Sequence, residues 1–171
     1  MIDKLLITPE DLEPYKDVSE NLDLERFNTY VIDAQFADIR LFLGRKLYTA
    51  LQADFDDVTK TFTDQRFIDL WDGVVVDDAQ FYGLKGALVQ YTYARLLDNI
   101  QLNITRAGVR KFDDEESEEA TQSQIRDKVN SARSMALLYI ADTRNYLNGS
   151  KLYPEWDVET TKNTSVDFFK V

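Results

Sequence analysis

Apolar side chains recur at three- and four-residue steps along three long stretches of this 171-residue chain. The stretches cover about residues 24–43, 78–102 and 121–147, and in the first two the apolar positions fall on two stripes. Such spacing is typical of α-helices, and a second stripe indicates that a helix is buried on more than one side. The pattern therefore predicts an all-α protein, a single-domain bundle of four to five helices, with stretch 78–102 as its central helix.

Glycine and threonine residues predict where several of these helices begin and end. Gly44 is expected to take a left-handed conformation after the first long helix, and residues 45–53 then form a second helix that turns back. Thr61 and Thr63 are rival N-caps for a short helix that stops at Gly73.

Smaller features predict how the helices pack. The β-branched run Val74–Val76 could be extended, but it is too short to predict a sheet. Gly86 and Ala87 lie within the central helix, where small side chains let a neighbouring helix approach closely. The tyrosines of the two longest helices are expected to lie mostly in the core, because aromatic residues at helical spacing usually do. They are Tyr82, Tyr91, Tyr93, Tyr139 and Tyr146.

A polar stretch with both signs of charge separates the two longest helices. Residues 103–112 form a basic arm, and residues 113–119 hold six carboxylates, which is more than half of the formal net charge of −11. Val109 and Phe112 predict that the arm orders against a neighbouring subunit, because both side chains would otherwise be exposed to water. The acidic block is expected to be a solvated loop or a channel lining that binds no ligand.

Beyond Gly149 the chain loses helical periodicity but keeps apolar side chains, which need a surface to bury against. We divide the chain into a helical bundle domain of residues 1–149, with the arm and the acidic loop at about 103–120, and an irregular docking tail of residues 150–171. Two placements of the tail stay open. It packs on its own domain, or it docks on a neighbouring subunit.

Residues of the arm and of the tail are accordingly predicted to lie at a subunit interface, where aromatic residues and arginine are enriched. They are Arg106, Val109, Arg110, Lys111, Phe112, Tyr153, Trp156, Phe168 and Phe169.

The chain lacks the usual machinery of catalysis. It has no cysteine and no histidine, which excludes disulfides, Ser–His and Cys–His pairs, and zinc sites built on these residues. The segment Asp54–Val58 begins like a calcium loop, but Val58 stands where a third oxygen ligand is needed. The six glycines are scattered and form no phosphate-binding loop. We therefore expect no catalytic residue, no cofactor and no metal, and a protein that is not an enzyme.

Charge and hydropathy limit the partners. An acidic chain is a poor sequence-independent binder of nucleic acid, because such binding depends on Lys and Arg displacing counterions from phosphates. The first residues lack the basic and apolar regions of a signal peptide, and eighteen apolar residues never occur in a row. The sequence predicts a soluble protein that is intracellular at synthesis and does not enter a membrane.

Four segments, in this order, resemble the head-tail connector (adaptor) proteins of tailed bacteriophages. They are Leu6–Leu12 (LITPEDL), Leu41–Tyr48 (LFLGRKLY), the turn Thr105–Val109 (TRAGV) after a long helix, and Tyr146–Trp156 (YLNGSKLYPEW). The likeness covers roughly residues 6–156, and the turn in the second segment and the order of the elements contribute most to it.

The resemblance implies a structural protein of the virion. Members of that family are small helical bundles that assemble into a ring beneath the portal, commonly as twelve copies, and let the genome pass through the centre. It implies a homo-oligomeric ring of twelve copies, the common form in that family, with the portal protein and other neck or tail proteins as partners. DNA would pass without specific binding, and the protein would be found at the head-tail junction of the virion and in the host cytoplasm during assembly.

Two other interpretations stay open. A soluble helical adaptor or regulatory protein would bind a single protein partner without forming a ring. A carboxylate-dependent hydrolase would need a deep cleft with two convergent acidic side chains in unlike environments.

Overall fold

The computed structural model describes residues 4–16, 23–76, 78–99, 102–105, 108–111 and 122–156, with the backbone alone for 102–105 and 108–111. In chain order its elements are a 3₁₀ turn η1 (Pro9–Asp11), α1 (Leu24–Ala34), a π-helical turn η2 (Gln35–Ile39), α2 (Arg40–Asp54), β1 (Phe55–Asp56), β2 (Thr61–Phe62), α3 (Gln65–Asp72), β3 (Val74–Val76), β4 (Ala79–Phe81), α4 (Lys85–Asn99), β5 (Leu102–Thr105), β6 (Gly108–Lys111) and α5 (Gln122–Gly149).

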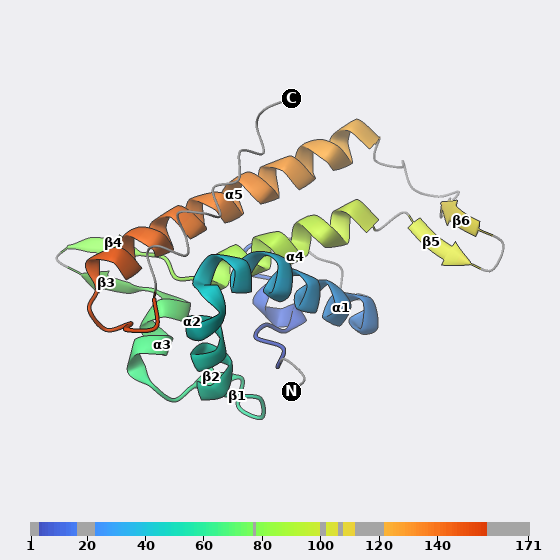
Figure 1. Ribbon diagram of the computed structural model, residues 1–171. Helices are drawn as coiled ribbons and strands as arrows, with labels where there is room; N and C mark the ends of the chain where they lie inside the picture. The colour runs from blue at the N-terminus through green and yellow to red at the C-terminus, as the bar shows by residue number, and fades with distance from the viewer. Residues whose placement is uncertain are drawn as a thin grey trace.

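Helix α4 lies between α5 on one side and α1 on the other (Figure 1). Helices α4 and α5 run antiparallel and form the most extensive helix pair of the fold. Consecutive residues of α4 from Gly86 to Gln90 are buried, as expected of a helix that is covered on more than one side. The prediction of a central helix in the 78–102 stretch is confirmed, although the helix itself begins only at Lys85.

The path from α1 to α2 contains two departures from regular α-helix. In η2 the backbone N–H of Arg40 donates to the carbonyl of Gln35, five residues earlier, which adds one residue to the turn. Gly44 then has φ +74° and interrupts the helical geometry within α2. The prediction that the first long helix turns at Gly44 in a left-handed conformation is therefore confirmed.

Two buried glutamines hold the N-terminal segment against α1 and α2. The side-chain carbonyl of Gln35 accepts from the N–H of Leu6 at 2.8 Å, and its amide donates to the carbonyl of Lys4 at 3.0 Å. Gln52 accepts from the N–H of Lys4 at 2.9 Å, and both amides donate to the Tyr48 hydroxyl. These side chains give an extended segment the hydrogen bonds that a neighbouring strand would provide. Leu6 is thereby fixed in the core.

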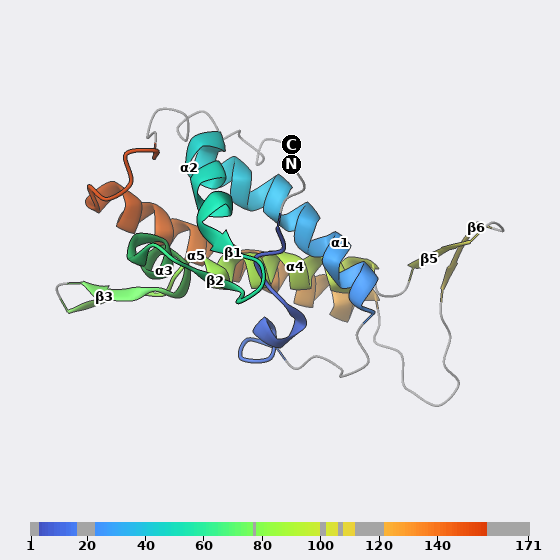
Figure 2. The ribbon, with the colours of Figure 1, turned by 90° about the horizontal axis from the view of Figure 1, so that it is seen from below.

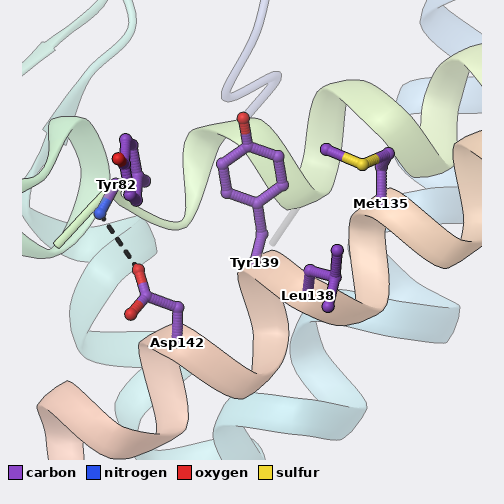
Figure 3. A pocket seen from close by; sticks show the side chains of 5 residues that line it. All are labelled: Tyr82, Met135, Leu138, Tyr139 and Asp142. Atoms are coloured by element: carbon purple, nitrogen blue, oxygen red, sulfur yellow. Dashed lines mark hydrogen bonds between the residues drawn. The ribbon is translucent and has the colours of Figure 1, made fainter.

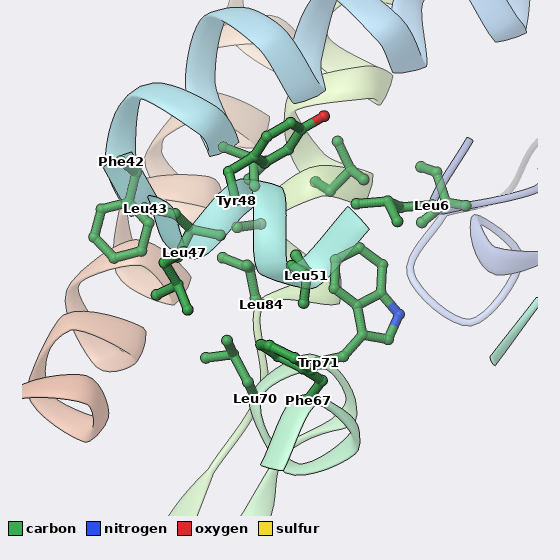
Figure 4. Packing of buried hydrophobic residues seen from close by; sticks show 14 of the residues in the cluster. Leu6, Phe42, Leu43, Leu47, Tyr48, Leu51, Phe67, Leu70, Trp71 and Leu84 are labelled. Carbon is green, nitrogen blue, oxygen red and sulfur yellow. The ribbon is translucent and has the colours of Figure 1, made fainter. Parts of the chain in front are cut away.

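The main core lies where α2, α3 and the start of α4 meet (Figure 4). Its fully buried side chains include Leu43, Leu47, Leu51, Leu70 and Leu84. Aromatic rings fill the space between α3 and the first hairpin, with the Phe62 ring centroid 5.5 Å from that of Trp71.

The prediction of an all-α fold is wrong. The structure is mostly helical, but short antiparallel pairs join β1 to β2, β3 to β4 and β5 to β6. Val74–Val76 pairs with Ala79–Phe81 through a tight turn in which Asp78 has φ +63°, a conformation typical of short hairpin turns. Pairs this short give almost no sequence signal, because each strand holds only two to four residues.

The start of α3 also differs from the prediction. Thr61 lies on β2, and Asp64 caps the helix by accepting from the N–H of Arg66. Asp64 competes well for this position because a carboxylate both accepts the hydrogen bond and favours the positive end of the helix dipole. The helix ends at Gly73 as predicted, with φ +91°.

Two glycines allow α3 and the turn before α4 to meet backbone against backbone. A Cβ on Gly83 would lie 2.3 Å from the carbonyl oxygen of Trp71, and one on Gly73 would lie 2.3 Å from that of Phe81. Both residues also have positive φ. A side chain at either position would therefore be strained and would collide with main-chain atoms.

We predict that Gly83→Ala lowers the free energy of unfolding by about 3 kcal/mol or more, because backbone strain and a backbone clash add together. Gly44→Ala is the matched control: its φ is similar at +74°, but a Cβ there meets nothing within 4 Å. That variant should lose less, about 1 to 2 kcal/mol, because it has the strain of a backbone conformation that favours glycine but not the clash. Urea unfolding followed by tryptophan fluorescence measures both, and equal losses would contradict the close approach at Gly83.

Candidate docking surface

A hollow of about 390 Å³ opens beside helix α5 (Figure 3). It is lined by Tyr82, Met135, Leu138, Tyr139 and Asp142. The side chains of Tyr82 and Leu138 are 62% and 63% exposed, although both are large and mainly apolar. Adjacent apolar side chains left in water on a folded surface are typical of a binding site.

Helical geometry brings most of this lining together. Met135, Leu138, Tyr139 and Asp142 follow one another at three- and four-residue steps, so they share one face of α5. Tyr82 is the residue directly after β4, and its backbone N–H donates to the Asp142 carboxylate at 3.1 Å. Asp142 thus fixes the turn before α4 against α5 and positions the Tyr82 ring at the edge of the hollow.

The Tyr139 ring extends from α5 toward α4 (Figure 3). It lies against Gly86, where an added Cβ would come within 2.5 Å of ring atom Cε1. The predicted role of Gly86, to let a neighbouring helix approach closely, is therefore confirmed. Tyr15 meets the same ring edge-on, with centroids 6.4 Å apart, and burial raises the pKa of the Tyr15 hydroxyl. The Tyr139 ring is held from two sides and cannot swing into the hollow.

The chemistry of the hollow is that of a docking surface. Its lining offers two aromatic rings, a thioether, a leucine and a single carboxylate. Neither a nucleophile with an adjacent base nor a pair of convergent acids is present among these residues. Apolar side chains with a nearby cation would be well matched to it.

A separate charged contact joins α4 to the π-helical turn. Arg95 Nη1 lies 2.7 Å from Asp38 Oδ2, and both side chains are largely buried. Burial raises the pKa of Asp38, and the neighbouring Arg95 opposes that effect. Arg133 of α5 pairs with Asp98 at 3.3 Å on the exposed side of α4. These ion pairs link helical elements to one another, and we assign them no role in binding or catalysis.

The segment after α5 is fixed to the helical body by Arg66. Its guanidinium donates to both carboxylate oxygens of Glu155, at 2.9 and 3.1 Å, and to the carbonyl of Leu152. The Tyr153 hydroxyl donates to the Arg66 carbonyl. Burial, followed by the hydrogen bond with the Tyr146 hydroxyl, strongly raises the pKa of Tyr153. Trp156 donates from Nε1 to Asn148 at 3.0 Å, and its ring packs on Phe42.

The structure brings together only part of the predicted interface set. Tyr153 and Trp156 are 4% and 9% exposed and lie in the core of their own chain, so residues 150–156 pack on the bundle. The backbone of Val109, Arg110 and Lys111 forms strand β6.

The remaining members of the set are Arg106, Phe112, Phe168 and Phe169, and all four lie outside the described residues. The interface role of the whole set stays a prediction.

Sequence reasoning missed the hollow. Tyr82 was assigned to the core, and Asp142 was not singled out among the acidic residues. A signal was present in α5, because Met135 and Leu138 lie off the buried stripe that contains Ala132, Ala136 and Ile140. Large apolar residues beside a complete buried stripe can indicate a second contact surface.

In the segment that begins like a calcium loop, two carboxylates accept hydrogen bonds from backbone N–H groups. Asp54 accepts from the N–H groups of Thr63 and Asp64, and Asp56 accepts from that of Val58. Within the described residues, no group of three or more acidic, histidine or cysteine side chains could hold a metal ion. In the same part of the chain, no helix is long and apolar enough to cross a membrane.

Fold and surface together define a mostly helical protein with an exposed apolar docking hollow. The chain belongs to the family of unknown function DUF6712, which matches it over residues 39–166. No curated protein and no solved structure matches the chain.

The Arg66–Glu155 pair predicts a pH-dependent stability. Hydrogen bonds from Arg66 lower the pKa of Glu155, so the folded state favours the ionised carboxylate. The stabilisation is present above the ordinary glutamate range and is lost as the pH falls through that range toward the lower folded pKa. We expect Glu155→Gln to lose about 1 to 2 kcal/mol at neutral pH and progressively less in acid.

Urea unfolding of the wild type and of Glu155→Gln at a series of pH values measures this difference. The exposed Glu13→Gln is the control and should follow the wild type throughout. A stability gap for Glu155→Gln that stayed constant into the acid range would show that the charge of Glu155 is not what anchors the segment.

Proposed function

We propose that the chain is a structural subunit that assembles into a ring, the head-tail connector of a tailed bacteriophage. In this role it joins the portal to the tail and lets the genome pass. The observation that carries the proposal is the β5–β6 hairpin, which lies between α4 and α5 in the chain and extends beyond the helical body (Figures 1 and 2).

A hairpin of this kind needs a partner. Its strands pair in register from Leu102 opposite Lys111 to Thr105 opposite Gly108, and the sheet has two strands in the part of the chain that is described. A lone two-stranded hairpin is marginally stable in water, and both of its outer edges offer backbone groups for pairing. Packing on a neighbouring copy would supply the missing contacts, including the addition of a strand at one edge.

The position of the hairpin suits a ring. A closed ring is built from head-to-tail contacts, in which one surface of each copy meets a different surface of the next. The hairpin lies between α4 and α5 in the chain, the most extensively packed helix pair, and its strands extend away from the bundle. A projecting arm of this kind can present one contact surface to the next copy.

The sequence likeness to connector proteins gives this assembly its biological setting. The acidic composition fits a channel protein, because an acidic lining would not hold the passing DNA. Positive charges in the arm would then serve contacts between subunits rather than contacts with nucleic acid.

Negative-stain microscopy and native mass spectrometry, each with and without the portal protein, test the proposal. We expect closed rings of one stoichiometry, formed alone or on the portal as a template. A chain that stayed monomeric at every concentration in both conditions would overturn it. A one-to-one complex with another protein and no ring would favour an adaptor or regulatory role instead.

Changes in the arm should separate its contribution from that of the acidic block. We predict that Arg106→Ala, Arg110→Ala and Lys111→Ala together reduce ring formation at least about tenfold, because charged contacts with a neighbour are lost. Neutralising the six acids of 113–119 to Asn and Gln is the matched control and should leave assembly largely intact. Circular dichroism verifies that both variants fold, and equal losses of ring would indicate that arm and acidic block bind each other.

A further inference from the structure

The described chain ends at Trp156, which packs at the C-terminal end of α5, and the hollow farther along the same helix is filled by no described residue. We propose that the C-terminal segment 157–171 folds back along α5 of its own chain and places Phe168 and Phe169 in that hollow. The inference concerns a contact within one chain and does not depend on ring assembly.

The starting point of the segment is fixed near the C-terminal end of α5. Trp156 is bonded to Asn148 and packed on Phe42, so it cannot move away from the bundle without losing both contacts. From Asn148 back to Met135, the far end of the hollow, the helix rises by about 20 Å. The twelve residues from Trp156 to Phe168 span up to about 40 Å when extended. Asn148 and Tyr139 are nine residues apart and face opposite sides of α5, so the segment must also cross around the helix, and its length is enough for both distances.

The composition of the segment matches the lining. Its last six residues, Val166–Val171 (VDFFKV), are mainly apolar and contain two adjacent aromatic rings. The hollow offers the rings of Tyr82 and Tyr139 beside Met135 and Leu138. Aromatic rings gain from edge and offset contacts with one another and from sulfur, in addition to the apolar area they bury.

Of the two charged residues that flank the phenylalanines, Asp167 and Lys170, the lysine has the sign that is complementary to the hollow. Asp142 is the charged residue in the lining, and Lys170 directly follows the two phenylalanines. When the rings occupy the hollow, Lys170 comes within reach of the Asp142 carboxylate at its edge. The remaining positions of the lining are uncharged, so nothing there repels an apolar occupant.

Attachment to the same chain favours this occupant over a segment from another copy. A tether of this length keeps the two phenylalanines at an effective concentration in the millimolar range, about 1 mM, which exceeds that of any separate copy in dilute solution. Large exposed residues such as Tyr82 and Leu138 would then be covered in the single chain.

Engineered cysteines test the contact, because the natural chain has none. Leu138→Cys with Val171→Cys places one thiol in the hollow and one beside the phenylalanines, which are both kept. Leu137→Cys with Val171→Cys is the matched control: Leu137 is the next residue of the same helix and is similarly exposed, but it does not line the hollow. In dilute protein under mild oxidation, we expect the first pair to form an intrachain disulfide about tenfold faster than the second.

Adding Phe168→Ser and Phe169→Ser to the first pair should slow its oxidation to the rate of the control pair. The proposal would be overturned if the two pairs formed their disulfides at equal rates. It would also be overturned if the first pair formed its disulfide equally fast with and without the two phenylalanines. Disulfide-linked dimers as the main product of the first pair, seen by non-reducing electrophoresis, would also overturn it, because the segment would then dock on another copy.

Discussion

The close packing of α5 on α4 is the constraint on which the rest of the structure depends. It requires a glycine at position 86, because the Tyr139 ring occupies the space that any side chain there would need. The same ring forms part of the docking hollow, so one contact sets both the spacing of the two long helices and the shape of the surface beside them. At the other end of the pair, the connection between these helices is the β5–β6 hairpin. Both candidate interaction surfaces thus belong to the same helix pair.

The sequence predicted the parts of the fold that depend on local pattern. Periodicity located the long helices, and Gly44 and Gly73 marked the points where the chain turns, because left-handed conformations strongly favour glycine. The hairpins escaped prediction, since pairing between strands of two to four residues is decided by the turn and by tertiary contacts rather than by the strands themselves. The valines Val74–Val76 indicated only that this stretch could be extended, whereas its pairing with β4 depends on the close backbone approach of Gly73 and Gly83 at the base of the hairpin.

The candidate site was harder to predict than the fold. The hollow combines α5 with a residue that follows β4, and the two are joined by a side-chain to backbone hydrogen bond between Asp142 and Tyr82. Such a bond has no signature in composition or spacing. Tyr153 and Trp156 lie in an irregular segment that Arg66 and Asn148 fix in the core of its own chain, and this burial could not be predicted from the sequence. Their predicted role at a subunit interface stays a prediction. An aromatic residue outside a helix can be as well buried as one inside it.

The π-helical turn Gln35–Ile39 has a consequence for variation among related proteins. The turn holds one residue more than a regular α-helical turn, so removing one residue there would restore the α-helical hydrogen-bond pattern and keep α1 facing the same way. The same deletion within α1 itself would rotate the residues before it by about 100° and take Val31 or Phe27 out of the core. Among related proteins, a change of length in this helical region is therefore expected at the π-helical turn rather than in the regular helix beside it.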